Sequence, residues 1–242
     1  MSSPKLLLSS LELVRGLLEY TSAVILKSSL EYLSPKGDGH PVIIFPGLAA
    51  SDGSLNYLRT FLDDIGYKTY SWGQGYNFGP REGINPFLEK LQKKLAEVYA
   101  ANGNRKVTLI GWSLGGIYVR ELAKLNPEMV RNVITLGTPF RPDSTARHVT
   151  FLYEFFSKDT LHKDPAFWKQ LKVKPPVPFT SVYSKSDGIV HWEASIEEVT
   201  EISENVEVPI SSHVGLVTNP FVMRVIADRL SQPEGGWEPY KT

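Results

Sequence analysis

Short apolar runs alternate with longer amphipathic segments along most of this 242-residue chain. The runs are rich in β-branched and aromatic residues and lie between turn residues, which is typical of buried strands. In the longer segments, apolar residues recur at three- and four-residue spacing, which predicts helices that bury one face. We expect strands at 41–45, 67–72, 106–110, 132–136, 179–184 and 206–208, and helices at 54–65, 84–100, 114–125 and 220–230, with one or more helical segments in 143–171.

Strands and helices that alternate in this way predict a parallel sheet with helices on both faces. The ligand crevice of such a sheet lies at the carboxyl ends of the strands. At this length, a single α/β domain spanning 1–242 is the expected organisation. Its last helix is well marked, because Asn219 is a suitable N-cap and Pro220 suits the first helical position.

The first 35 residues precede the alternating pattern. Apolar residues at mixed three- and four-residue spacing, among them Leu7, Leu11, Val14 and Leu18, predict one or two amphipathic helices in 1–35. Two interpretations stay open for these helices. They either pack on the core, or they form a lid or contact a lipid surface.

Charge and composition exclude several classes of function. The 26 Lys and Arg residues equal the 26 Asp and Glu residues, so no net field would attract nucleic acid or an anionic membrane. The absence of cysteine excludes disulfides, thiolate metal sites and a cysteine nucleophile. No apolar run approaches the length of a membrane span, and Glu12, Arg15 and Glu19 interrupt the one that begins near Leu6. We therefore predict a soluble, cytoplasmic protein.

A Gly-x-Ser-x-Gly pentapeptide, Gly111 to Gly115, joins the strand at 106–110 to the helix at 114–125. Such a turn holds its central serine in a strained conformation, and glycines on either side let the backbone bend sharply. The pattern is that of a nucleophile elbow. Ser113 is accordingly the candidate nucleophile.

A serine hydroxyl needs a base to take its proton and an acid to orient that base, in the chain order serine, acid, histidine. Of the five histidines, His213 fits best, because it lies in a loop after a predicted strand and immediately before the last helix. His191 is the alternative, since it closely follows Asp187. Asp187 itself, just past the strand at 179–184, is the candidate acid, although an Asp-Gly pair also suits an ordinary turn.

Attack on a carbonyl creates an oxyanion, which backbone N–H groups stabilise. One donor should be Leu114, the residue after the nucleophile, and we assign the other to Leu48, in the loop after the first strand. A plain Pro-Gly turn at Pro46-Gly47 is the competing interpretation.

With these residues, the chain resembles the α/β-hydrolase superfamily, and more narrowly its bacterial lipase- and esterase-like members. The resemblance runs from about residue 40 to 230 and is carried by five elements in the family's order: 45–48, 111–116, 136–140, 187–190 and 213–215. It implies a Ser113, Asp187, His213 triad that acts through an acyl-enzyme and requires no metal or organic cofactor. Pro46-Gly47 replaces the usual His-Gly of the oxyanion loop. Because the family's first antiparallel strands are not evident, we expect a reduced, mainly parallel sheet of about six strands.

Specificity is expected to depend on two regions. The segment 141–177 is rich in aromatic residues, among them Phe151 and Phe155, and predicts a helical cap whose rings either line the substrate pocket or seal the cap against the core. The loop after the second strand brings Tyr76 and Asn77 toward the crevice as candidate substrate contacts. We predict a carboxylic-ester hydrolase for small ester substrates with short or medium acyl chains. The alternatives are a lipase or acyltransferase at a lipid interface, and a hydrolase-fold binding protein without catalysis.

Overall fold

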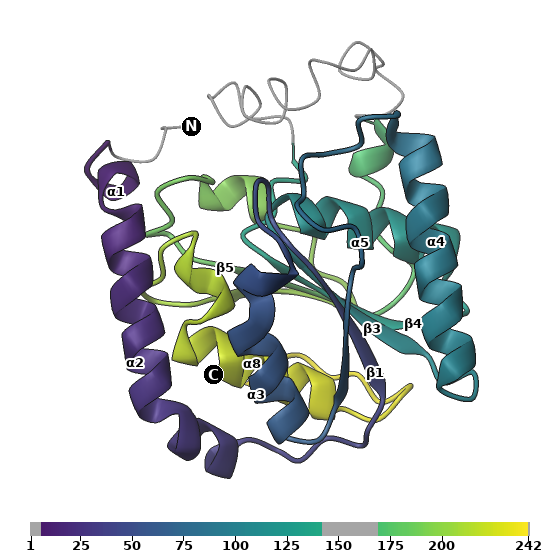
Figure 1. Ribbon diagram of the computed structural model, residues 1–242, viewed down its shortest axis with the longest axis horizontal. Coiled ribbons are helices and arrows are strands. Elements are labelled where there is room, and N and C mark those ends of the chain that lie inside the picture. Colours follow the sequence, from purple (N-terminus) through teal and green to yellow (C-terminus); the bar gives the residue numbers. More distant parts are fainter. Residues whose placement is uncertain (1–5, 142–168, 242) are drawn as a thin grey trace.

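The computed structural model describes residues 6–141 and 169–241. Its centre is a six-stranded sheet in the order β2-β1-β3-β4-β5-β6, in which every neighbouring pair is parallel (Figure 1). The strands are β1 (Pro41–Phe45), β2 (Lys68–Ser71), β3 (Val107–Trp112), β4 (Val130–Leu136), β5 (Phe179–Tyr183) and β6 (Ser203–Glu207). This confirms the predicted parallel α/β sheet.

Helices cover both faces of the sheet. They are α1 (Leu6–Ser10), α2 (Glu12–Leu33), α3 (Asn56–Asp64), α4 (Ile84–Ala101), α5 (Leu114–Leu125) and α8 (Pro220–Ser231), with short 3-10 turns η1 (Asp52–Leu55), η3 (Trp192–Ser195) and η4 (Gly215–Val217). The alternation along β1 separates the two layers of core. Ile43 and Phe45 belong to the apolar cluster with α4 and α5, whereas Val42 and Ile44 belong to the cluster with α3 and α8.

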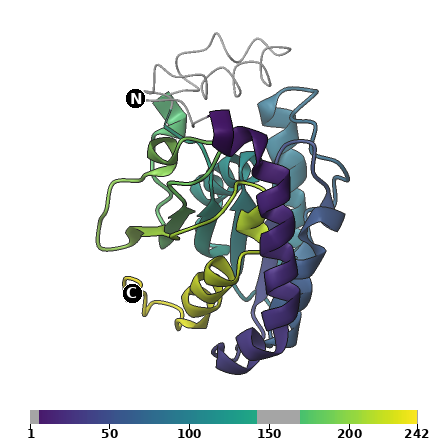
Figure 2. The same ribbon diagram turned by 90° about the vertical axis from the view of Figure 1, so that its left-hand side faces the viewer.

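Helix α2 lies outside the helices that cover the sheet, and it packs against α3, α8 and η4. Figure 2 shows it running along the outer side of the molecule. Only Glu12, Gly16 and Ala23 of its residues are buried, so the helix contacts the domain along one narrow stripe. Along this stripe α2 packs on the rest of the domain, as in the first of the two interpretations of the N-terminal helices.

The last strand was predicted to begin at residue 206, and this was wrong by three residues, because β6 begins at Ser203. Its polar start gave no apolar signal. Glu204 is nonetheless buried, because Arg229 lies 2.9 Å from its carboxylate and Thr180 donates to it at 2.8 Å. A paired, hydrogen-bonded charge can be buried at a strand where an unpaired one cannot.

Candidate active site

Ser113 occupies a strained turn between β3 and α5, with φ 53° and ψ −120°. The glycines around it are required by close contacts with neighbouring atoms. A Cβ atom on Gly115 would lie 2.5 Å from the carbonyl oxygen of Phe45, and one on Gly111 or Gly116 would collide with Gly116 or Thr138 respectively. A non-glycine residue with positive φ is uncommon and marks a position held by its surroundings. The elbow expected from the sequence has this geometry.

Asp187 and His213 lie in the loops that follow β5 and β6, and a 2.7 Å hydrogen bond joins Oδ2 of the aspartate to Nδ1 of the histidine. The other carboxylate oxygen accepts from the backbone amides of Ile189 and Val190, at 2.8 and 2.7 Å. The indole of Trp112 donates to the carbonyl oxygen of His213 at 3.0 Å. Both partners of the pair are thus fixed on more than one side.

The electrostatic surroundings raise the pKa of His213. Burial alone would lower its pKa, but the charge of Asp187 and its hydrogen bond, together with the charge of Glu12, outweigh burial and raise the pKa above 6.5. A raised pKa makes the imidazole a stronger base.

Ser113 and His213 line the same cavity, whose volume is about 280 Å³. The other lining residues are mostly apolar or small: Gly47, Leu48, Ala49, Trp112, Ile189 and Val214. Among the described residues, neither the amide of Leu48 nor that of Leu114 donates a hydrogen bond to another residue. Leu48 lines the cavity, and Leu114 directly follows Ser113, so the assignment of these two amides to an oxyanion hole stays a prediction.

Asn77 is held by the protein on all sides. Its side chain is completely buried, donates to the carbonyl oxygen of Pro46 at 2.7 Å, and accepts from the amide of Gly79 at 3.2 Å. Its backbone exchanges hydrogen bonds of 2.8 Å with Ala49 and Ala50. With these groups occupied by the protein, Asn77 supports the loop that carries Leu48, and its role toward substrate stays a prediction.

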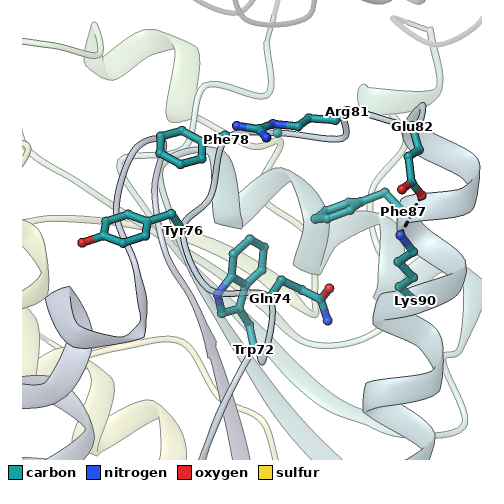
Figure 3. Close-up of a pocket in the computed structure, with 9 residues that line it drawn as sticks. Trp72, Gln74, Tyr76, Phe78, Arg81, Glu82, Phe87 and Lys90 are labelled. Carbon is teal, nitrogen blue, oxygen red and sulfur yellow. Dashed lines mark hydrogen bonds and ion pairs between the residues drawn. The ribbon is translucent and has the colours of Figure 1, made fainter.

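Tyr76 lines a second cavity of about 220 Å³, separate in its lining residues from the one at Ser113. Its ring stacks on Phe78, and Figure 3 shows both near Trp72 and Phe87, with the ion pair of Glu82 and Lys90 at the far side. The role of Tyr76 toward substrate stays a prediction. Phe151 and Phe155, and most of the expected cap, lie outside the described residues.

The charged residues of α2 contact the site, although the sequence did not predict this. Glu12 accepts hydrogen bonds from the amides of Gly188 and His213, and Glu19 accepts one from the amide of Ser212. These acidic residues appeared only as interruptions of an apolar run. Their spacing of seven, with Arg15 between them, places them on one face of a helix and could have indicated a polar contact surface.

In the ranges 6–141 and 169–241, no group of three or more acidic or histidine side chains is arranged to hold a metal ion. No helix in the same ranges has the length and apolar character of a membrane span.

A parallel sheet with a strained serine turn after an inner strand, and with acid and histidine loops after the last two strands, has α/β-hydrolase architecture. The sequence model of the alpha/beta hydrolase fold family matches residues 40–177. This chain belongs to that family.

Two bacterial relatives are named as triacylglycerol lipases. The proteins of Pseudarthrobacter phenanthrenivorans and Burkholderia plantarii are each 34% identical to this chain over 132 residues, or 52% of it. The match covers 39% and 34% of those two proteins, so this chain spans well under half the length of either. A protein of Arabidopsis thaliana named Phospholipase A(1) LCAT3 is 36% identical over 115 residues, which are 40% of this chain and 26% of that protein.

Solved structures share the fold at lower identity. A lipase-esterase related protein of Clostridium acetobutylicum superposes with a TM-score of 0.59 and 19% identity, covering 81% of this chain and 96% of that one. The monoacylglycerol lipase of Paleococcus ferrophilus gives a TM-score of 0.57 and 15% identity, covering 82% and 96%. At these identities the likeness is one of fold.

Proposed function

We propose that this chain is a carboxylic-ester hydrolase in which Ser113 is the nucleophile, His213 the base and Asp187 the orienting acid. The observation that carries the proposal is the cavity at the elbow, because the strained serine and the Asp187-bound histidine both line it. Relatives named as lipases support the same reaction class.

The reaction follows from the roles of these groups. His213 takes the proton of the Ser113 hydroxyl as the oxygen attacks the ester carbonyl carbon, and the amides of Leu48 and Leu114 stabilise the oxyanion. The intermediate collapses to an acyl-enzyme, and the departing alcohol leaves with the proton from His213. Water, deprotonated by His213, then attacks the acyl carbonyl. The carboxylic acid is released, and the proton on His213 returns to the Ser113 oxygen.

The cavity supports short or medium acyl chains. Its volume, about 280 Å³, lies near the lower end of the range for small-molecule sites, and its walls carry few polar groups. An acyl chain of a few carbons would bury apolar surface there without leaving polar atoms unpaired.

Hydrolysis of p-nitrophenyl acyl esters tests the proposal. Ser113→Ala should abolish turnover and labelling by a fluorophosphonate, whereas Ser22→Ala, on the exposed side of α2, should retain both. Turnover by Ser113→Ala at the wild-type rate would refute Ser113 as nucleophile. Failure of the wild-type protein to react with the probe would favour the third alternative, a binding protein with this fold.

A second candidate, a lipase at a lipid interface, is favoured by the outer face of α2. Exposed apolar residues cover this face, including Leu13 at 77%, Leu17 at 65% and Ile25 at 76% exposure. All five charged residues of the helix, namely Glu12, Arg15, Glu19, Lys27 and Glu31, are at least partly buried. An apolar face of this kind suits an uncharged lipid surface.

Helix α2 also lies beside the cavity, because Gly16 on its buried stripe packs against Val214 in the cavity wall. A long-chain ester tested below and above its micellar threshold separates the two candidates. For the lipase, the rate should rise at the threshold, and Leu17→Gln with Ile25→Gln should remove that rise without affecting monomeric esters. A rate unchanged across the threshold would exclude the lipase. Release of an ester instead of a free acid, when an alcohol is added, would identify an acyltransferase.

A further inference from the structure

The inner stripe of α2 contacts both loops that carry the candidate base and acid. Arg15 donates to the carbonyl oxygen and hydroxyl of Ser186, at 2.7 and 2.9 Å, immediately before Asp187. Glu19 accepts from the amide of Ser212, at 2.7 Å, immediately before His213. The helix therefore joins two loops that come from different strands.

Glu12 makes the most direct of these contacts. One carboxylate oxygen accepts from the amide of Gly188 at 2.6 Å, and the other accepts from the amide of His213 itself at 2.7 Å. The residue is only 4% exposed. A single carboxylate thus bridges the residue after Asp187 and the backbone of the histidine, which fixes the separation of the two loops.

The position of Glu12 is not explained by stability alone. Burial raises the pKa of its carboxyl group, and the charge of Asp187 raises it further, although the hydrogen bond from Gly188 acts in the opposite direction. Ionisation of Glu12 therefore costs free energy of folding. Arg15, at 3.5 Å, offsets part of the burial of charge.

The charge of Glu12 also acts on the histidine. Together with Asp187, it is one of the two carboxylates whose negative charge raises the pKa of His213. An imidazolium forms transiently when the serine proton moves to the histidine, so a second negative charge nearby stabilises that state.

We propose that Glu12 is a positioning residue of the triad, which holds the histidine and acid loops at a fixed separation and supplies a second carboxylate behind His213. This inference rests on the proposed hydrolase function. It assigns to α2 a role in catalysis in addition to any contact with a lipid surface.

Three variants separate charge, geometry and structure. Glu12→Gln removes the charge. It also places the side-chain NH2 group opposite one of the two backbone amides, of Gly188 or His213, that donate to Glu12. Glu12→Asp keeps the charge but shortens the side chain by one methylene group. Glu19→Gln is the matched control, since Glu19 is seven residues along the same face and bonds to Ser211, Ser212 and Asn219.

For Glu12→Gln we expect kcat to fall about ten- to a hundredfold with a smaller change in KM, since displacement of a catalytic group by about 1 Å has an effect of this size. The acid limb of the pH profile of kcat/KM should move to lower pH. Glu12→Asp should lower kcat and leave the acid limb where it is in the wild type. Glu19→Gln should lower the midpoint of thermal unfolding without moving the acid limb.

An NMR titration of the His213 ring in isotope-labelled protein measures its pKa without turnover, and thermal unfolding shows whether each variant is folded. A Glu12→Gln profile and ring pKa equal to those of the wild type would overturn the inference. Equal losses of kcat in Glu12→Gln and Glu19→Gln, with the acid limb unshifted in both variants, would also overturn the inference. If the wild type neither hydrolyses esters nor reacts with a fluorophosphonate, the proposed function fails, and the ring titration still decides whether Glu12 acts on His213.

Discussion

The side-chain amide of Asn77 donates a 2.7 Å hydrogen bond to the carbonyl oxygen of Pro46, which joins the loop after β2 to the loop after β1. The second of these loops carries Leu48, the expected oxyanion donor. A side chain that is itself completely buried and bonded at both ends of its amide can hold such a loop rigidly.

Replacement of Asn77 by alanine should lower kcat and leave KM nearly unchanged. The lost hydrogen bond would leave the Pro46 carbonyl unsatisfied, at a cost to stability of about 1–3 kcal/mol. It would also release the loop that carries Leu48, and a displacement of about 1 Å there would lower the rate by up to about a hundredfold. Steady-state kinetics on a soluble ester measures the effect. Tyr118→Phe, which removes only the 3.3 Å bond to Asn77 Oδ1, is the matched control. A raised KM with unchanged kcat would instead indicate that Asn77 contacts substrate.

Replacement of Asp187 by asparagine should preserve the fold and reduce kcat by a factor on the order of 10⁴, because the amide favours the wrong tautomer of the histidine. Asp187 Oδ2 is the acceptor 2.7 Å from His213 Nδ1, and an amide nitrogen there cannot accept. Kinetics measures the loss of kcat, and thermal unfolding of the same sample shows whether the fold is preserved. Activity within a few-fold of the wild type would show that another acid orients the histidine.

The activity should decline in acid with a midpoint above pH 6.5. Only the neutral imidazole can take the serine proton, and the pKa of His213 is raised above 6.5 because Asp187 and Glu12 outweigh its burial. As the pH falls through that raised value, the fraction of neutral His213 falls, and kcat/KM falls with it. A pH profile on an ester of non-ionising alcohol measures this midpoint. A midpoint below 6.5 would contradict the charge arrangement.

The same shift affects stability with a definite sign. The folded protein binds the His213 proton more tightly than the unfolded chain, so the contribution is full below pH 6.5 and is lost as the pH rises through the raised folded pKa. Urea unfolding of the wild type and His213→Gln across this range measures it. The free energies of unfolding of the two proteins should differ most at the acid end of the range.

Replacement of Gly115 by alanine should destabilise the protein by about 2–3 kcal/mol through overpacking. The new Cβ atom would lie 2.5 Å from the carbonyl oxygen of Phe45 and 2.7 Å from that of Pro46, and backbone atoms cannot move aside as a flexible side chain does. Gly53→Ala is the matched control, since its Cβ would meet only Ser51 Oγ at 3.4 Å. We expect the control to change the free energy of unfolding by no more than about 1 kcal/mol.

Apolar patterning was sufficient to predict the sheet and the helices around it. Val42, Ile43 and Ile44 are buried on both faces of β1, so the strand appears in the sequence as a continuous apolar run. The start of β6 could not be found in this way, because Glu204 is buried by means of a distant arginine, Arg229, that local sequence does not reveal.

The candidate site was predictable only where the chemistry is local. The elbow is contained within five residues, and strand order places the acid and histidine after their strands. Asn77 and Glu12 depend on partners 31 and 201 positions away, and no local pattern encodes those distances. The sequence therefore indicated neither the bond of Asn77 to Pro46 nor the bond of Glu12 to the His213 amide.

The bond between Glu12 and the His213 amide spans 201 positions of the chain. During synthesis, α2 leaves the ribosome before any strand of the sheet, whereas its partner loops appear only after β5 and β6 have been made. Contacts of such long range form late, because the entropy of closing the loop is lost before the contact is gained. We therefore expect the elbow to form before the histidine loop is held in place, so that the nascent chain acquires its nucleophile first and its full reactivity only when α2 bonds to the histidine loop.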